Sequence, residues 1–214
     1  MLRFPNKPRI SAMAPRYRLD DEDEKPDAKA PEPQLFMAIP QALFKARTVL
    51  IFGEVDMKMA ERVTANLLAL ASEGEGDIKI IINSPGGHVE SGDTIHDMIK
   101  ALRPRVKMIG TGWVASAGVH IFLGADKANR FAMPNTRFMI HQPLGGVRGK
   151  ASDIQIEAEE ILKMHDRINK TIAAETGQPL SRVQNDTDRN FWMGPEDAKA
   201  YGLVSRVIER LDKV

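Results

Sequence analysis

Short apolar runs alternate with amphipathic stretches from residue 35 onward, and this alternation predicts strands that are followed by helices. Apolar residues over 48–52 and 78–82 predict two strands, and the second is too apolar to face water on either side. Between them, Asp56 is a suitable N-cap for a helix that ends near Gly74 and Gly76. One face of this helix is apolar and carries Met59, Val63, Leu67 and Leu70.

The rest of the chain continues this order with less regular elements. Gly110 and Gly112 are expected to end a third strand and lead into a helix of small residues. Repeated strand–helix units predict an α/β fold with largely parallel strands. The predicted elements are helices over 89–102, from about 114 and over 152–174, and strands over 106–109, 137–140 and 204–208.

The first 34 residues differ in composition from the remainder. They hold six prolines and a block of charge over 20–25, so we expect a flexible tail over 1–34 and one domain over 35–214. Residues 1–19 carry five basic residues and no acid, as organelle transit peptides do. Three prolines interrupt any amphipathic helix there, which favours an ordinary tail.

Composition excludes several classes of chemistry. The 214 residues include no cysteine, which excludes disulfides, thiolate zinc sites, iron–sulfur clusters and a cysteine nucleophile. The net charge of +1 provides no overall field for nucleic acid or an anionic membrane, and the apolar runs are too short to cross a bilayer. With no secretory apolar segment at the start, we expect a cytoplasmic protein that binds neither nucleic acid nor membrane.

No motif for a metal or a nucleotide is present in the sequence. A phosphate loop and a dinucleotide fingerprint are both absent, and the histidines lack the spacing of metal ligands. We therefore expect no cofactor in this chain. The five histidines are His88, His96, His120, His141 and His165.

Ser116 is the first candidate for catalysis. It is flanked by alanines at the predicted transition from strand to helix, where free backbone N–H groups and the helix dipole favour an oxyanion. The alternative is a helix start whose small residues pack tightly against the sheet. The surrounding residues do not form the G-x-S-x-G elbow of α/β-hydrolases.

His141 is the candidate base, because it ends a predicted strand and histidine is the usual base for a serine nucleophile. The alternative is a half-buried imidazole bonded to backbone at the strand end. His120 is a rival base, since it lies one helical turn after Ser116. On a helix, however, that spacing usually points both side chains along one face instead of directing their reactive atoms at each other.

A glycine turn over 83–87 is the third candidate segment. Glycines after a buried strand let backbone N–H groups face a cavity, as an oxyanion hole requires. The alternative is a plain turn. Each of the three segments is ambiguous alone, and the case rests on their combination and order.

Taken together, the three segments closely resemble the Clp protease proteolytic subunit family, ClpP. The motifs are Ile-Ile-Asn-Ser-Pro-Gly-Gly at 81–87, Ala-Ser-Ala-Gly at 115–118 and Met-Ile-His-Gln-Pro-Leu-Gly-Gly at 139–146. The likeness spans about residues 35–210. It implies the ClpP/crotonase-like fold, a spiral of β-β-α units with a protruding handle helix over 152–174.

The resemblance implies a self-compartmentalising serine endopeptidase and assigns roles by position. Ser116 matches the nucleophile, and His141 matches the general base. The backbone N–H groups of Gly87 and Ala117 match the oxyanion hole. The third member of the family's triad is usually an aspartate, but an ungapped alignment from His141 places Asn190 there.

The resemblance also implies partners. Copies of the chain would form two stacked seven-membered rings joined through the handle helix, which enclose the serines. An unfoldase of the AAA+ type would feed unfolded polypeptides into the chamber and would use the ATP. Lys79 and Ile81 stand where the family often places aromatic residues for docking of the unfoldase.

Asn190 keeps a second function open, that of a weakly active or structural subunit in mixed rings with an active paralogue. Asp186 and Asp188 lie close enough in sequence to substitute for it, although the ungapped register argues against both. A third interpretation, a relative of the enoyl-CoA hydratases, gives no reason for the pairing of Ser116 with His141.

Overall fold

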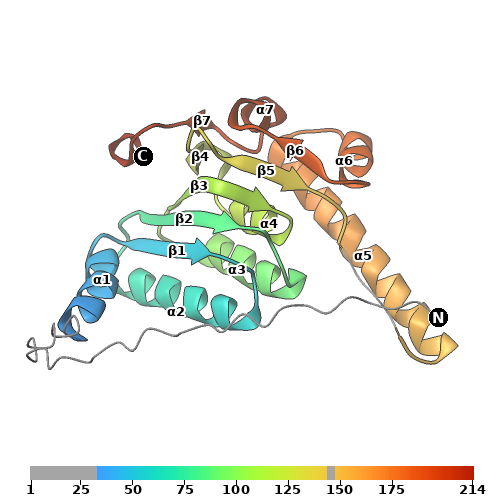
Figure 1. The fold of residues 1–214 in the computed structure, drawn as a ribbon, viewed down its shortest axis with the longest axis horizontal. Helices are drawn as coiled ribbons and strands as arrows, with labels where there is room; N and C mark the ends of the chain where they lie inside the picture. The colour runs from blue at the N-terminus through green and yellow to red at the C-terminus, as the bar shows by residue number, and fades with distance from the viewer. Residues whose placement is uncertain (1–32, 144–147) are drawn as a thin grey trace, which may run out of the picture.

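One seven-stranded sheet organises residues 33–143 and 148–214, the part of the chain that the computed structural model describes. Helices α2, α3 and α4 cover one face of the sheet, and α5 runs past its edge (Figure 1). The helices are α1 (Pro33–Lys45), α2 (Met57–Glu73), α3 (Val89–Ala101), α4 (Ala117–Phe122), α5 (Ala151–Thr176), α6 (Leu180–Thr187) and α7 (Pro195–Tyr201). The strands are β1 (Thr48–Phe52), β2 (Ile78–Ser84), β3 (Val106–Ala115), β4 (Arg130–Ala132), β5 (Arg137–Ile140), β6 (Phe191–Met193) and β7 (Arg206–Val207).

The ten-residue strand β3 forks the sheet. Strands β1, β2, β3, β4 and β7 pair in that order, and all of these pairs are parallel. The first half of β3 pairs with β4, whereas its last three residues pair with β5. Strand β6 then pairs antiparallel with β5. The fork therefore brings the ends of β3 and β5 and the start of β6 to one place.

The N-terminal units follow the sequence pattern closely. Asp56 caps α2 by accepting a hydrogen bond from the Met59 backbone N–H at 2.7 Å, and the predicted apolar stripe of this helix is buried. Gly74 ends the helix as expected. In β2 only one face is fully buried, because Lys79 and Ile81 remain partly exposed, so the prediction of two covered faces is half right.

Several elements differ from the prediction. Strand β3 continues to residue 115 instead of ending near 109, and the last strand covers two residues instead of five. Helix α1, with Pro40 inside it, was not predicted, and neither were the three-residue strands β4 and β6. Helix α1 begins two residues inside the expected tail, the rest of which lies outside the described residues, as do residues 144–146 of the third motif.

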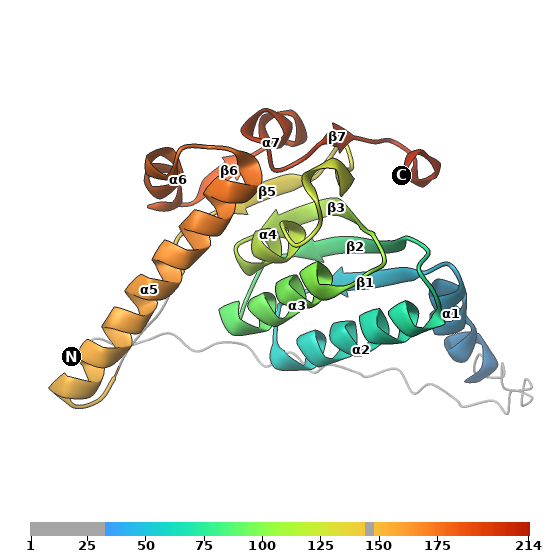
Figure 2. The same ribbon diagram turned by 180° about the vertical axis from the view of Figure 1, so that it is seen from behind.

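Helix α5 is the predicted handle, and its N-terminal half projects away from the sheet (Figures 1 and 2). Its buried residues, among them Ile168 and Ile172, all lie in the C-terminal half. On the projecting half, Ile154, Ile156 and Leu162 are 41, 59 and 66% exposed. Within the described residues no helix combines the length and apolarity that a membrane crossing requires.

Candidate active site

Ser116 stands at the junction of β3 and α4 in a strained backbone conformation. Its φ of 54° is positive, which costs a residue with a side chain about 1–3 kcal/mol and marks a position that the surrounding structure enforces. The Ser116 backbone N–H donates to the Met139 carbonyl at 2.9 Å, so the turn is tied to β5. The structure therefore confirms that this serine lies where a strand gives way to a helix.

Strand pairing brings the candidate base to the serine. The end of β3 lies in register with β5. His141, which follows β5, is therefore close to Ser116, which follows β3. The imidazole Nε2 of His141 is 2.8 Å from Ser116 Oγ. The rival base His120 is not bonded to Ser116 Oγ; its Nε2 pairs with Asp93 Oδ1 at 2.8 Å.

Asn190 reaches the other nitrogen of the same ring. Strands β5 and β6 pair antiparallel, with Ile140 opposite Phe191. Asn190, which precedes β6, therefore lies beside His141, which follows β5. The Oδ1 of Asn190 is 3.0 Å from His141 Nδ1. An amide oxygen accepts only, so Nδ1 carries the hydrogen and Nε2 is left to accept the proton of the serine hydroxyl.

Neither nearby aspartate takes this position in the described part of the chain. Asp186 Oδ2 instead accepts a hydrogen bond from the Tyr201 hydroxyl at 2.9 Å. Desolvation and that neighbouring carboxylate raise the pKa of Tyr201 well above its usual range, so its hydroxyl remains a donor. Asp188 has a side chain that is 68% exposed and lies 3.8 Å from Arg189.

The loop that carries Asn190 is held from two sides. The backbone N–H of Gln142 donates to the Thr187 carbonyl at 2.7 Å, and the Gln142 side chain donates to the Asp188 carbonyl at 3.0 Å. From α5, the buried side chain of Asn169 accepts a hydrogen bond from Thr187 Oγ1 at 2.9 Å. These supporting residues were not predicted, because their roles depend on contacts between distant segments.

The glycine turn approaches Ser116 closely. A Cβ on Gly86 would lie 2.6 Å from Ser116 Cβ, and one on Gly87 would lie 2.3 Å from the Val55 carbonyl, so no larger residue fits either position. The turn is held by the buried Ser84, whose Oγ donates to the Gly53 carbonyl at 2.6 Å. Sequence reasoning identified the turn but not the hydrogen bond of Ser84 or the close approach of Gly86 to Ser116.

The two predicted oxyanion donors are available. Among the described residues, the backbone N–H groups of Gly87 and Ala117 have no hydrogen-bond partner. Both belong to segments that contact Ser116, one through the Gly86 turn and one as the next residue in the chain. Two donors without partners therefore lie on segments next to Ser116, as an oxyanion hole requires.

A groove of about 370 Å³ runs across these groups. It is lined by the Gly86–Gly87 turn, Ser116 and His141 together with Glu54, Pro85, Val89 and Pro143. A larger cavity of about 550 Å³ lies between α1, β1 and α2, but none of the candidate residues lines it. In the described ranges no three histidines, aspartates or glutamates gather as metal ligands would.

Comparisons with known proteins agree on one family. The model of the Clp protease family matches residues 32–211. The ATP-dependent Clp protease proteolytic subunit 3 of Rhizobium johnstonii is 53% identical over 190 residues, which cover 89% of this chain and 97% of that protein. Subunit 2 of Gluconobacter oxydans is 50% identical over 208 residues, with 93% and 92% covered. The solved structure of ClpP1 from Listeria monocytogenes superposes with a TM-score of 0.75 at 53% identity and covers 82% of this chain and 98% of that one.

Proposed function

The chain belongs to the Clp protease family and has its α/β fold, and from this premise we propose that Ser116, His141 and Asn190 form the catalytic triad of a Clp-type serine endopeptidase subunit. The single observation that carries the assignment is the continuous chain of hydrogen bonds from Ser116 Oγ through both ring nitrogens of His141 to Asn190. These three residues come from three separate segments that only the fold brings together.

In the first half of the reaction, Ser116 Oγ attacks the carbonyl carbon of the scissile peptide bond while its proton passes to His141 Nε2. The negative charge on the carbonyl oxygen is stabilised by the N–H groups of Gly87 and Ala117, each worth about 3 kcal/mol in such sites. The C–N bond then breaks, and His141 gives the same proton to the leaving amine.

In the second half, His141 takes a proton from water, and the resulting hydroxide attacks the acyl ester on Ser116. The ester C–O bond breaks, Ser116 regains its proton from His141, and the carboxyl end of the cut chain leaves. Asn190 holds the ring in the tautomer that both halves need. It supplies no negative charge to the imidazolium that forms, which predicts a slower enzyme than one with a carboxylate.

The chain is a subunit of an oligomeric Clp protease. Beyond that, we propose two stacked seven-membered rings that meet through α5, whose exposed Ile154, Ile156 and Leu162 are apolar side chains that a contact would cover. Unfolded polypeptides would be the substrates, delivered in the cytoplasm by an AAA+ unfoldase that uses the ATP. The chain itself would need no cofactor.

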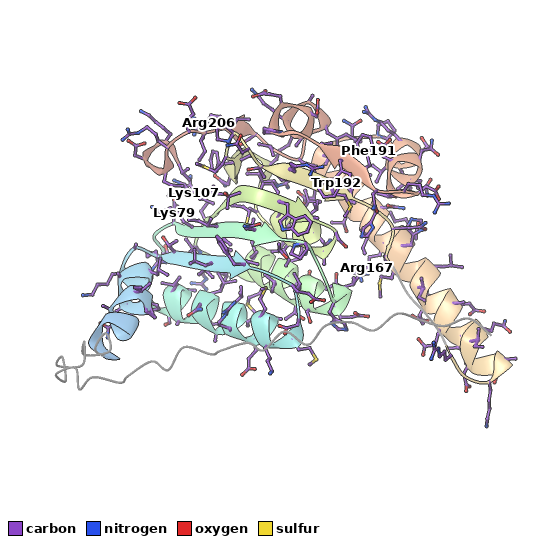
Figure 3. All side chains as sticks on the ribbon, in the orientation of Figure 1. Lys79, Lys107, Arg167, Phe191, Trp192 and Arg206 are labelled. Carbon is purple, nitrogen blue, oxygen red and sulfur yellow. The ribbon has the colours of Figure 1, made fainter. Side chains whose placement is uncertain are left out.

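Two features bear on the partners of this assembly. Ile81 packs against a small apolar cluster of Ile109, Phe131 and Ile208 on the sheet, beside Lys79 and Lys107, which lie in register on β2 and β3 (Figure 3). We propose this surface for docking of the unfoldase, with lysine in place of one aromatic side chain. The second proposed partner is an active ClpP paralogue in mixed rings, because the neutral Asn190 weakens the activity of this subunit and the paralogue would supply it.

A fluorophosphonate probe tests the assignment of the nucleophile. The assembled protein should be labelled on Ser116, and Ser116→Ala should abolish labelling without changing the size of the particle. Ser72→Ala is a matched control, because Ser72 lies on α2 and bonds only to a carbonyl of its own helix. An assembled, folded sample with no adduct on Ser116 would contradict the proposal.

A further inference from the structure

A single carboxylate links three helices beside the proposed active site. Asp93 lies on α3, and its Oδ1 is 2.8 Å from Nε2 of His120 on α4. Both guanidinium Nη atoms of Arg167 on α5 donate to the same carboxylate at 2.7 Å, and Figure 3 shows where Arg167 lies on that helix. The side chain of His120 is 5% exposed and that of Asp93 is 18% exposed, so their contact is largely shielded from water.

The Asp93 carboxylate is ionised in the fold. Although burial opposes ionisation, the hydrogen bonds from His120 and Arg167 hold the pKa of Asp93 well below its usual range. An ionised carboxylate only accepts hydrogen bonds, so His120 Nε2 donates to it. A hydrogen bond to a charged group is roughly twice as strong as one between neutral groups, so Asp93 holds the ring of His120 firmly.

Helix α4 depends on contacts of this kind for its position. It has six residues, fewer than a helix needs to be stable by itself, and it follows the positive φ of Ser116. Ser116 stands at the N-cap of α4 but does not cap it, because its hydroxyl is bonded to His141 instead. Among the described residues, the bond from His120 to Asp93 is the one hydrogen bond that a side chain of α4 makes. The polar attachment of α4 therefore rests on Asp93.

This attachment lies one helical turn from a proposed oxyanion donor. Ala117 begins α4, and His120 follows three residues later on the same side of the helix. Gly92, the neighbour of Asp93 on α3, approaches Ala117 closely, since a Cβ on Gly92 would lie 3.3 Å from Ala117 Cβ. The ring of His120 also stacks on His96 of α3, with ring centroids 4.5 Å apart. Neighbouring residues of α3 therefore contact both ends of the first turn of α4, and a shift of His120 would move Ala117 with it.

We propose that Asp93 is a positioning residue, which through its bond to His120 holds α4 so that the Ala117 backbone N–H points to the place where the oxyanion forms. The inference rests on the proposed function, because an oxyanion forms only during attack by Ser116. An oxyanion donor acts in the transition state and not in substrate binding, so its displacement lowers kcat and leaves KM nearly unchanged. A merely structural role of Asp93 would change stability but not the kcat of each folded site.

Two substitutions of Asp93 test this proposal on the assembled, full-length protein. Asp93→Leu removes the acceptor, so we expect kcat for peptide hydrolysis to fall about tenfold, a part of the loss of about 100-fold or more that follows removal of a whole oxyanion donor. Asp93→Asn loses the charge that faces Arg167 but keeps an oxygen that accepts from His120, so its kcat should stay within about twofold of the parent's. KM should change by less than about twofold in both variants.

Lys100→Gln is the matched control. Lys100 pairs with Glu175 at 2.7 Å, so this variant also removes an ion pair between α3 and α5, but one that does not involve α4. It should keep the kcat of the parent. Rates are expressed per Ser116 that a fluorophosphonate labels at saturation, which corrects for misfolded copies. If Asp93→Leu does not assemble, Asp93→Ala, which adds no bulk, is measured in its place.

The outcomes separate the two proposals. An unchanged kcat in Asp93→Leu, a change in KM alone, or an equal loss of kcat in Lys100→Gln would overturn the role of Asp93 and leave the endopeptidase standing. A fall in Asp93→Asn as large as in Asp93→Leu would overturn it as well, because the bond to His120 would then not be what matters. Absence of hydrolysis by the parent would contradict the proposed function and the inference with it.

Discussion

The Oδ1 atom of Asn190 lies 3.0 Å from Nδ1 of His141, so a neutral amide occupies the position behind the proposed base. This geometry orients the imidazole toward Ser116 as a carboxylate would, but it adds no charge to stabilise an imidazolium. Orientation and charge are therefore separable in this site, and Asn190→Asp tests the contribution of charge.

Asn190→Asp should raise the rate of peptide hydrolysis. A negative charge beside the ring stabilises the imidazolium that forms during attack, and a gain of about tenfold corresponds to about 1.4 kcal/mol. The measurement compares the two proteins under identical assembly conditions. Asp188→Asn is the control, since Asp188 is exposed and pairs only with Arg189, and its rate should not change. An unchanged rate for Asn190→Asp would mean that another group already stabilises His141.

Gly86→Ala and Gly53→Ala separate backbone strain from close approach. Both glycines have φ near +90°, so the backbone strain of alanine alone should cost about 1 kcal/mol of stability at either position, and the clash at Gly86 adds to it there. Only a Cβ on Gly86 meets Ser116, whereas a Cβ on Gly53 meets nothing within 4 Å. We expect peptide hydrolysis to fall about 100-fold in Gly86→Ala, because the nucleophile is displaced, and to persist in Gly53→Ala. Equal activities would show that the turn does not position Ser116.

Much of the fold could be predicted from local sequence. Strand β1 and helix α2 follow from an apolar run, an N-cap at Asp56 and a helical stripe, all of which act over a few residues. Strand β3 was predicted too short because Gly110 and Gly112 resemble strand breakers. In the fold, Gly110 gives Phe138 and Val114 room beside the strand, and β5 supplies the pairing that carries β3 on to Ala115.

The elements and contacts that were missed depend on tertiary structure. Strands β4 and β6 have three residues each and exist only through pairing with β3 and β5. Ser116 and His141 were candidates because of their places at predicted strand ends, whereas their roles, and Asn190 itself, came from the family motifs and an ungapped register. No local pattern relates Asp93 to Arg167, which lie 74 residues apart, or either of them to His120.

Asp93→Asn should destabilise the protein in a manner that depends on pH. The pKa of Asp93 is lowered in the fold, so its stabilisation is fully present above the usual carboxyl value of 3.8 and is lost as pH falls below it. A loss of about 1 kcal/mol would lower the melting temperature by about 2–4 °C at pH 7, and the difference should shrink toward pH 3. Asp166→Asn, in an exposed pair with Lys170, should show little change at either pH. A difference that does not depend on pH would contradict this account.

Ile156→Asp should separate the stacked rings. Ile156 is 59% exposed on the projecting half of α5, and a charge buried there in a contact between rings would cost several kcal/mol. Native mass spectrometry should show particles of half the parent's mass, whereas Gln155→Asp, on the neighbouring position, should leave the full particle intact. Ile168 is unsuitable for this test, because it is buried against the chain's own core. A full particle with Ile156→Asp would place the contact elsewhere.

The most direct test of the central claim is peptide hydrolysis by the purified assembly, with and without Ser116→Ala. The 2.8 Å contact indicates that Ser116 and His141 are the nucleophile and the base. The parent should therefore hydrolyse peptide, and Ser116→Ala should do so at least about 1000-fold more slowly. Ser72→Ala should match the parent. Hydrolysis that survives in Ser116→Ala, or its absence from the assembled parent both alone and mixed with a paralogue, would contradict the account.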